Sequence, residues 1–275
     1  MTQAEIKPWI GDVAAEVIAV SRAGGQVQPF SSRYTDFTFA DAYEIAQRVR
    51  DIRVASGETA IGRKIGFTNR TVWDGYGLSA PIWGYMYDST VQDLPSLNAR
   101  FKLAGLAEPR IEPEIVLQLA SSPHPDMTDE ALLGCIDWIA HGFEIVQSIF
   151  PGWAFEPPDA VAAQGVHVAL LIGERHPTSR ARERWGEALS NFRIKLLRDG
   201  KVMTHGHAHD VLGGPIQALR FLVRELAHRP ASEPLRSGEI VTTGTLTQAM
   251  PAAPEETWAT VLTGIDVAGL QVRFE

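Results

Sequence analysis

The feature that most constrains the fold is a change in texture after about residue 57. From there on, short apolar runs rich in β-branched and aromatic residues are separated by clusters of glycine, proline and aspartate. This pattern is typical of strands joined by turns. The predicted strands span residues 64–68, 111–119, 143–146, 166–172, 193–197, 239–243, 258–262 and 270–274. Asp199-Gly200 lies between two apolar runs and predicts a two-residue hairpin turn.

Helical segments are few and unevenly placed. The N-terminal part predicts helices over 12–22 and 39–52. Two further helices are predicted, one over 128–140 and one from Pro215 to just before Pro230. Because strands and helices do not alternate regularly, a doubly wound parallel sheet is disfavoured. The sequence therefore predicts an α+β fold, with a small helical N-terminal region, residues 1–60, packed on a larger, mainly β domain, residues 61–275.

Size and charge exclude several classes of protein. A chain of 275 residues can bury roughly 75% of its unfolded surface, and 45% hydrophobic residues is typical of a globular protein. The net charge of −8 argues against a nucleic-acid partner, since phosphate binding needs clustered basic residues. The single cysteine, Cys135, fits a reducing compartment and is expected to be a buried filler. No leader or membrane-spanning stretch is evident, so we expect a soluble cytoplasmic protein that does not bind membranes.

Two glutamates at the start of a predicted strand are the first candidates for chemistry. Residues two apart on a strand face the same side, so Glu112 and Glu114 project together where the strand enters a core. Two such carboxylates repel each other unless a proton or cation lies between them, and hard oxygen ligands suit Mg²⁺ or Mn²⁺. The alternative is a solvated strand edge, for which Pro113 is a marker.

A third carboxylate and a lysine extend this candidate site. Glu144 lies in a predicted strand with apolar neighbours, which argues against a solvent-exposed glutamate without a function. Three carboxylates would hold Mg²⁺ and leave positions open for substrate. Lys64 shares a predicted strand with Ile65, and a partly desolvated lysine beside a metal ion can have a lowered pKa and move protons. The alternative is a surface lysine whose stem covers apolar neighbours.

Histidines and a glycine supply two further candidates. His205, His207 and His209 would share one face of a strand and could bind Zn, Fe or Ni, although a solvated hairpin arm also explains them. Gly244 ends a predicted strand and would permit a close backbone approach to an anionic ligand. An ordinary strand-ending turn is the alternative for Gly244.

Several of these stretches, in their order along the chain, resemble the 2-keto-4-pentenoate hydratase / 4-oxalocrotonate decarboxylase family of the fumarylacetoacetate hydrolase-like superfamily. The matching segments are 39–43, Lys64-Ile65-Gly66-Phe67-Thr68, Glu112-x-Glu114, Glu144-Ile145, 211–215 and 238–245. The resemblance implies a mixed β-roll catalytic domain and a homo-oligomer. It also implies a divalent ion, Mg²⁺ or Mn²⁺, held by Glu112, Glu114 and Glu144.

The same resemblance gives roles to residues around the ion. It implies that Lys64 is an acid/base group and that Gly244 and Thr245 contact the substrate, a small 2-oxo acid or dienol of the meta-cleavage pathway of aromatic degradation. Arg63 is expected to assist Lys64 in binding an anionic substrate in this acidic protein.

Departures from the family pattern bear on the reaction. The chain reads Pro81-Ile82-Trp83-Gly84 where hydratases usually have aspartate at the second position, and Ile82 cannot carry a proton. It also has Gln147-Ser148-Ile149 and Ala162-Ala163-Gln164 in place of more polar segments. These differences favour a decarboxylase over a hydratase. In a hydratase without that aspartate, water activation would have to come from Asp88 or from a metal-bound water molecule. An acylpyruvate C–C hydrolase, which needs a His–Glu pair, and an inactive metal-dependent ligand binder are the remaining alternatives.

Overall fold

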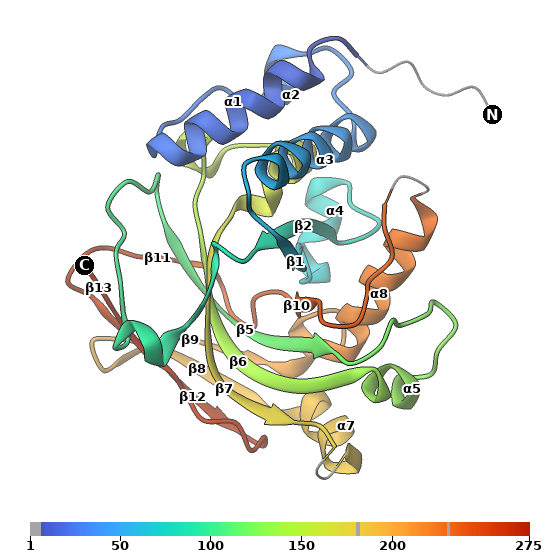
Figure 1. Cartoon of the computed structure of the whole chain (residues 1–275). Coiled ribbons are helices and arrows are strands. Elements are labelled where there is room, and N and C mark those ends of the chain that lie inside the picture. Colours follow the sequence, from blue (N-terminus) through green and yellow to red (C-terminus); the bar gives the residue numbers. More distant parts are fainter. Residues whose placement is uncertain (1–6, 180–181, 230–231) are drawn as a thin grey trace.

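The computed structural model describes residues 7–179, 182–229 and 232–275 (Figure 1). The α-helices are α1 (Ile10–Ala23), α2 (Phe30–Arg33), α3 (Phe39–Ala55), α4 (Trp73–Tyr76), α5 (Asp129–Gly134), α6 (Pro157–Ala162), α7 (Arg182–Asn191) and α8 (Pro215–His228). The strands are β1 (Ala60–Gly66), β2 (Ile82–Tyr87), β3 (Val91–Asp93), β4 (Arg100–Phe101), β5 (Arg110–Leu119), β6 (Ile136–Val146), β7 (His167–Pro177), β8 (Arg193–Arg198), β9 (Lys201–His207), β10 (Ile240–Thr242), β11 (Met250–Pro251), β12 (Thr257–Thr263) and β13 (Gln271–Phe274). Short 3₁₀ turns include η4 (Gln164–Val166) and η5 (Ala208–Asp210).

The strands form two sheets. The larger sheet has the order β2-β1-β10-β5-β6-β7-β3, with β11 added beside β5, and the smaller sheet has the order β4-β13-β12-β8-β9. Figure 1 shows β5, β6 and β7 curving across the molecule, with the smaller sheet beside them. Pairing is mixed, since β1–β10 and β3–β7 are parallel while β5–β6 and β6–β7 are antiparallel. Apolar side chains from both sheets share one core, among them Phe143, Trp258 and Phe274.

The N-terminal helices form a layer at one end of the molecule (Figure 1). In α3, Thr38 and Asp41 form a capping box, in which Asp41 accepts the Thr38 backbone N–H at 2.9 Å. The apolar face of α1 packs in a core that also contains residues of α6, so the helical layer extends beyond residues 1–60. None of the helices in the described ranges is both long and apolar enough to cross a bilayer.

Most predicted elements are confirmed, and one is wrong in its second half. The hairpin turn at Asp199-Gly200 joins β8 to β9, and both residues have positive φ, 49° and 78°, as a type I′ turn requires. The helix predicted over 128–140 ends at Gly134, and β6 begins at Ile136. The apolar spacing suited a helix, but pairing of β6 with β5, from Ile136 opposite Leu119 onward, overrides it. Cys135 lies between these two elements and is buried, as predicted.

Candidate metal centre

The pairing of β5 with β6 brings three glutamates together. Glu112 on β5 lies directly opposite Glu144 on β6, and Glu114 follows two residues later on the same face of β5. One carboxylate oxygen from each of the three lies within 4.8 Å of the others. Glu114 and Glu144 are fully buried, and Glu112 is partly exposed. The three carboxylates predicted to be ligands therefore converge.

Each of the two buried glutamates uses one oxygen for a hydrogen bond to a backbone N–H or a histidine. Glu114 Oε2 accepts the Gly244 backbone N–H at 2.7 Å, and Glu144 Oε1 lies 2.7 Å from His167 Nδ1. Among the described residues, Glu114 Oε1 has no hydrogen-bond partner, and Glu144 Oε2 is paired only with Lys64 Nζ, at 3.1 Å. Buried carboxylate oxygens without donors are costly, and a hard divalent cation bound by oxygens fits this arrangement.

The pKa values of the three carboxyl groups also fit a bound divalent cation. Burial, reinforced by Glu144, raises the pKa of Glu112 to about 7 and the pKa of Glu114 well above its usual value. Burial acts in the same direction on Glu144, but Lys64 and His167 hold the pKa of that carboxyl at about 2. The cluster consequently has more acidic groups than its own cations can neutralise.

Lys64 lies at the centre of this cluster. It is 2% exposed, and its Nζ donates to the Gly165 carbonyl oxygen at 2.9 Å. Gly165 has φ +64°, and a Cβ there would meet Lys64 Cδ at 2.6 Å, so the lysine stem needs a glycine beside it. Burial alone would lower the pKa of Lys64, but the three surrounding carboxylates raise it above its ordinary value. The lowered pKa expected from the sequence refers to a lysine beside a metal ion, and it stays a prediction.

Arg63 does not join the cluster. Successive residues on a strand face opposite sides, and the Arg63 guanidinium lies 2.8 Å from Glu239 and stacks on the Tyr85 ring at 4.3 Å. The position expected for Arg63, beside Lys64 and the substrate, is therefore wrong.

A cavity of about 630 Å³ opens in front of Lys64 and Glu112. Its apolar lining includes Phe67, Tyr76, Ile82, Trp153 and Phe155, and its polar lining includes Arg110, His205, Asp210 and Thr245. Of the two residues predicted to contact substrate, Thr245 lines the cavity, whereas Gly244 binds Glu114 through its N–H. Gly244 has φ +94°, and a Cβ there would meet Thr68 Oγ1 at 2.2 Å, which requires glycine.

Two residues at this site were missed in the sequence. Arg110 lies two positions before Glu112 and stacks on Trp153 at 4.1 Å, so strand alternation was an available signal for it. His167 reaches Glu144 only because β6 pairs with β7, with Val146 opposite His167. No local pattern indicates that contact.

The three histidines separate. β9 ends at His207, and His209 lies on the following 3₁₀ turn, so the expectation that all three share one strand face is wrong. His205 lines the cavity, while His207 and His209 gather with Asp210, with one ligand atom from each within 4.8 Å.

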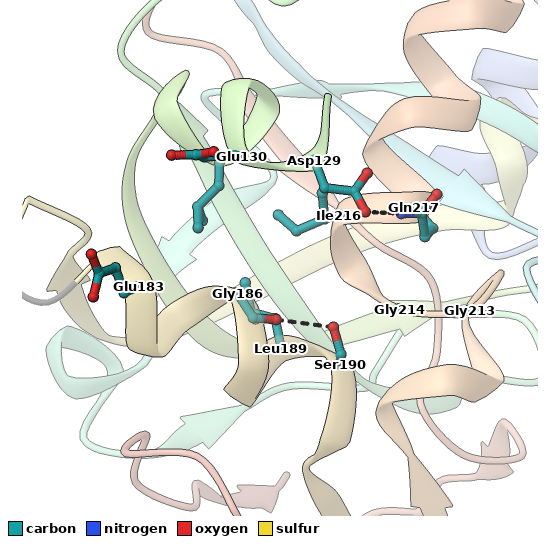
Figure 2. A pocket seen from close by; sticks show the side chains of 11 residues that line it. Asp129, Glu130, Glu183, Gly186, Leu189, Ser190, Gly213, Gly214, Ile216 and Gln217 are labelled. Atoms are coloured by element: carbon teal, nitrogen blue, oxygen red, sulfur yellow. Dashed lines mark hydrogen bonds between the residues drawn. The ribbon is translucent and has the colours of Figure 1, made fainter. Parts of the chain in front are cut away.

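A separate cavity of about 570 Å³ lies between α5, α7 and the start of α8 (Figure 2). There the Gln217 side chain donates to Asp129 Oδ2 at 2.7 Å, and Ser190 donates to the Gly186 carbonyl oxygen at 2.9 Å. Neither cluster of metal-ligand residues found in the described ranges lies at this cavity. Glu112 of the carboxylate cluster instead lines the cavity at Lys64.

Comparison with known proteins gives a consistent result. No protein-family model matches the chain. The chain is 29% identical to a 2-hydroxyhexa-2,4-dienoate hydratase from Comamonas testosteroni, over 96% of this chain and 98% of that one. It is 30% identical to a 2-keto-4-pentenoate hydratase from Paraburkholderia phymatum, over 74% and 75% of the two chains.

The fold also has a solved counterpart. A 4-oxalocrotonate decarboxylase from Pseudomonas putida G7, complexed with magnesium and adipate, matches over 100% of both chains with a TM-score of 0.89 and 22% identity. This match, together with weaker matches to fumarylacetoacetate hydrolase family proteins, confirms the predicted α+β fold.

Proposed function

The chain belongs to the 2-keto-4-pentenoate hydratase / 4-oxalocrotonate decarboxylase family, and we propose that Glu112, Glu114 and Glu144 hold its catalytic metal ion. The protein is an enzyme, a metal-dependent lyase that acts on a small enolisable 2-oxo acid or dienol of the meta-cleavage pathway. The ligand set and the roles of individual side chains are the proposal.

The observation that carries the proposal is the excess of buried carboxylate at one end of the cavity. Glu114 Oε1 is buried and has no hydrogen-bond donor in the described part of the chain, and Glu144 Oε2 has only Lys64 Nζ, at 3.1 Å. An all-oxygen donor set suits Mg²⁺ or Mn²⁺, and the similar decarboxylase is complexed with magnesium. When bound, such an ion supplies Lewis-acid polarisation of the substrate's C2 oxygen and offsets the negative charge of the cluster.

Lys64 would handle the proton. Its raised pKa keeps Nζ protonated at neutral pH, and its bond to Gly165 holds Nζ at the deep end of the cavity. From there it would donate a hydrogen bond to the enolate that develops on the substrate, and pass a proton to it. Burial of Nζ strengthens this interaction because water does not screen it.

Arg110 and Thr245 would bind the rest of the substrate. Arg110 lies on the same face of β5 as Glu112, and its stacking on Trp153 fixes the guanidinium at the cavity wall. A guanidinium there can pair with a second carboxylate, and the similar decarboxylase is complexed with adipate, a dicarboxylate. The Thr245 hydroxyl donates to the Thr247 carbonyl oxygen at 2.9 Å and accepts the Thr247 backbone N–H at 3.4 Å, which leaves one lone pair for the substrate.

We favour decarboxylation of a dicarboxylic 2-oxo acid. Ile82 is buried in the cavity wall, and loss of a distal carboxylate as CO₂ requires no activated water. Asp88, the alternative water activator from the sequence, is exposed and accepts backbone N–H bonds from Thr59 and Ser89, and it is not among the cavity-lining residues. The apolar part of the wall excludes water from the reacting carbons.

Hydration is the second candidate. Two of the curated relatives described above are dienoate hydratases, and His205 and Asp210 line the cavity as groups that could orient a water molecule. An acylpyruvate C–C hydrolase is not favoured. It needs a His–Glu pair that activates water, and in the pair formed by His167 and Glu144 both side chains are buried within the carboxylate cluster.

Product analysis separates these reactions. Purified protein with Mg²⁺ would be incubated with 4-oxalocrotonate and, separately, with freshly generated 2-hydroxypenta-2,4-dienoate. The proposal predicts CO₂ from the first, whereas a 4-hydroxy-2-oxo acid from the second would identify a hydratase. Binding of both compounds without turnover would contradict the lyase assignment. Glu112→Gln serves as the metal-site control.

The homo-oligomeric state and the cytoplasmic location stay predictions. The first rests on the family and the second on the single cysteine of the chain. Light scattering after size exclusion tests the first, and fractionation of the native host tests the second.

A further inference from the structure

A second group of metal-ligand side chains lies at the rim of the catalytic cavity. His207 Nδ1 lies 3.7 Å from Asp210 Oδ2, and His209 Nε2 lies 3.4 Å from Asp210 Oδ1. The two imidazole rings stack with their centroids 5.0 Å apart. We propose that His207, His209 and Asp210 form a second metal site, separate from the carboxylate cluster, that binds a borderline transition-metal ion such as Zn²⁺.

The separations are close to those that coordination needs. With metal–ligand bonds of about 2.0–2.1 Å, the ligand atoms of a tetrahedral site lie about 3.3 Å apart. His209 Nε2 and Asp210 Oδ1 are near this separation, His207 Nδ1 lies 3.7 Å from the other carboxylate oxygen, Oδ2, and one ligand atom from each of the three residues lies within 4.8 Å of the others. Rotation of the exposed His209 ring is enough to close the remaining distance.

The backbone holds the carboxylate in place. Asp210 Oδ2 accepts the His207 backbone N–H at 2.8 Å, which fixes the turn of η5. The other oxygen, Oδ1, is thereby directed towards His209. The turn thus presents two imidazoles and one carboxylate oxygen on one side.

Ligand chemistry separates this site from the carboxylate cluster. Two imidazoles and one carboxylate suit Zn²⁺, Co²⁺ or Ni²⁺, whereas three carboxylates suit Mg²⁺ or Mn²⁺. The side chains are 43%, 66% and 36% exposed for His207, His209 and Asp210, so an ion reaches them directly from solvent. Three protein ligands leave at least one coordination position for water or another ligand.

Occupancy would change the charge at the cavity mouth. Asp210 lines the catalytic cavity, and a divalent ion would replace its negative charge with a net positive one. An anionic substrate would then be attracted rather than repelled, a consequence that rests on the proposed function.

The test uses the whole protein saturated with Mg²⁺, so that the carboxylate cluster is filled, and titrates Zn²⁺ by calorimetry and Co²⁺ by visible absorption at pH 7.5. We expect one further equivalent of either ion. His207→Ala and His209→Ala should each lower the affinity for this additional ion by about tenfold or more. His228→Ala is the matched control, since His228 is an exposed histidine at the end of α8 and should not affect binding.

Two results would overturn this proposal. One is the absence of an additional equivalent in the Mg²⁺-saturated protein. The other is an equivalent that persists in both histidine variants. Glu112→Gln should retain the Zn²⁺ equivalent, so loss of the zinc in that variant would assign the ion to the carboxylate cluster instead. Circular dichroism of each variant confirms that the fold is kept.

Discussion

Arg63 and Lys64 are adjacent on β1, so their buried, positively charged side chains lie on opposite faces of the strand. The groups that surround the two side chains differ. Arg63 faces one carboxylate, Glu239, at 2.8 Å, and stacks on Tyr85. Lys64 faces three, with Glu144 nearest at 3.1 Å. On the Arg63 face the charges balance one to one, whereas on the Lys64 face they do not.

This difference separates a structural ion pair from a binding site. A buried pair whose charges balance needs no added ion, although Arg63 Nε also has no hydrogen-bond partner among the described residues. An unbalanced cluster raises the pKa of Glu112 and Glu114 and leaves one buried oxygen, Glu114 Oε1, without a donor. A cation from solution relieves that imbalance. We therefore assign ion binding to the Lys64 face of β1 and a stabilising role to the Arg63 face.

The largest effect is expected from removing one metal ligand. Glu112→Gln should lower kcat/KM by about 10³-fold or more, because several kcal/mol of Lewis-acid stabilisation is lost. Glu239→Gln, the matched change on the Arg63 face, should leave kcat/KM within about twofold. Steady-state kinetics at saturating Mg²⁺ measures both. Equal losses in the two variants would remove the distinction between the faces.

Removing the lysine should have a smaller effect of a different kind. Lys64→Met should lower kcat by about 10²-fold, as expected for loss of a proton donor, while Mg²⁺ binding is retained. The ion no longer competes with Nζ for Glu144, so its affinity should be unchanged or higher. Kinetics combined with Mg²⁺ titration would contradict this if the variant lost the metal as well.

Removing the arginine should affect stability instead of chemistry. Arg63→Met leaves the Glu239 carboxylate without its partner in a site where the Arg63 side chain is 4% exposed and that of Glu239 is 15% exposed. Unfolding in urea should show a loss of about 2–3 kcal/mol, reduced from the fully buried case because Glu239 retains some solvent. A lowered kcat with unchanged stability would place Arg63 in the catalytic machinery after all.

The smallest effect is a proton release linked to metal binding. At pH 7, Glu112 is about half protonated because burial raises its pKa to about 7, and burial also raises the pKa of Glu114 well above its usual value. The ion binds the ionised form, so binding expels protons, and Mg²⁺ affinity falls as the pH drops below about 7. Calorimetry in two buffers of different ionisation enthalpy measures this release. Glu239→Gln should leave it unchanged, and a proton count near zero would contradict the raised pKa values.

Local periodicity predicted the parts of this site that lie on one strand. Glu112 and Glu114 converge because side chains two apart share a face, and the same rule would have identified Arg110 and excluded Arg63. Glu144 was found because it lies in an apolar strand.

Contacts between distant segments were not predictable in this way. β10 lies between β1 and β5 in the sheet, although about 120 residues or more separate it from either in the sequence, and it carries Gly244 to Glu114. His167 reaches Glu144 through the register of β6 on β7. The early start of β6 was missed for a similar reason, since its partner strand and not its own periodicity decides its conformation.

The central claim is that the three glutamates form the ion site, and counting bound Mn²⁺ by electron paramagnetic resonance tests it most directly. In a variant with His207 and His209 replaced by alanine, the carboxylate cluster is the remaining proposed metal site. One Mn²⁺ per chain should bind to this variant and be displaced by Mg²⁺. Glu112→Gln in the same background should lose it, and Glu239→Gln should retain it. An unchanged Mn²⁺ count in Glu112→Gln would contradict the account.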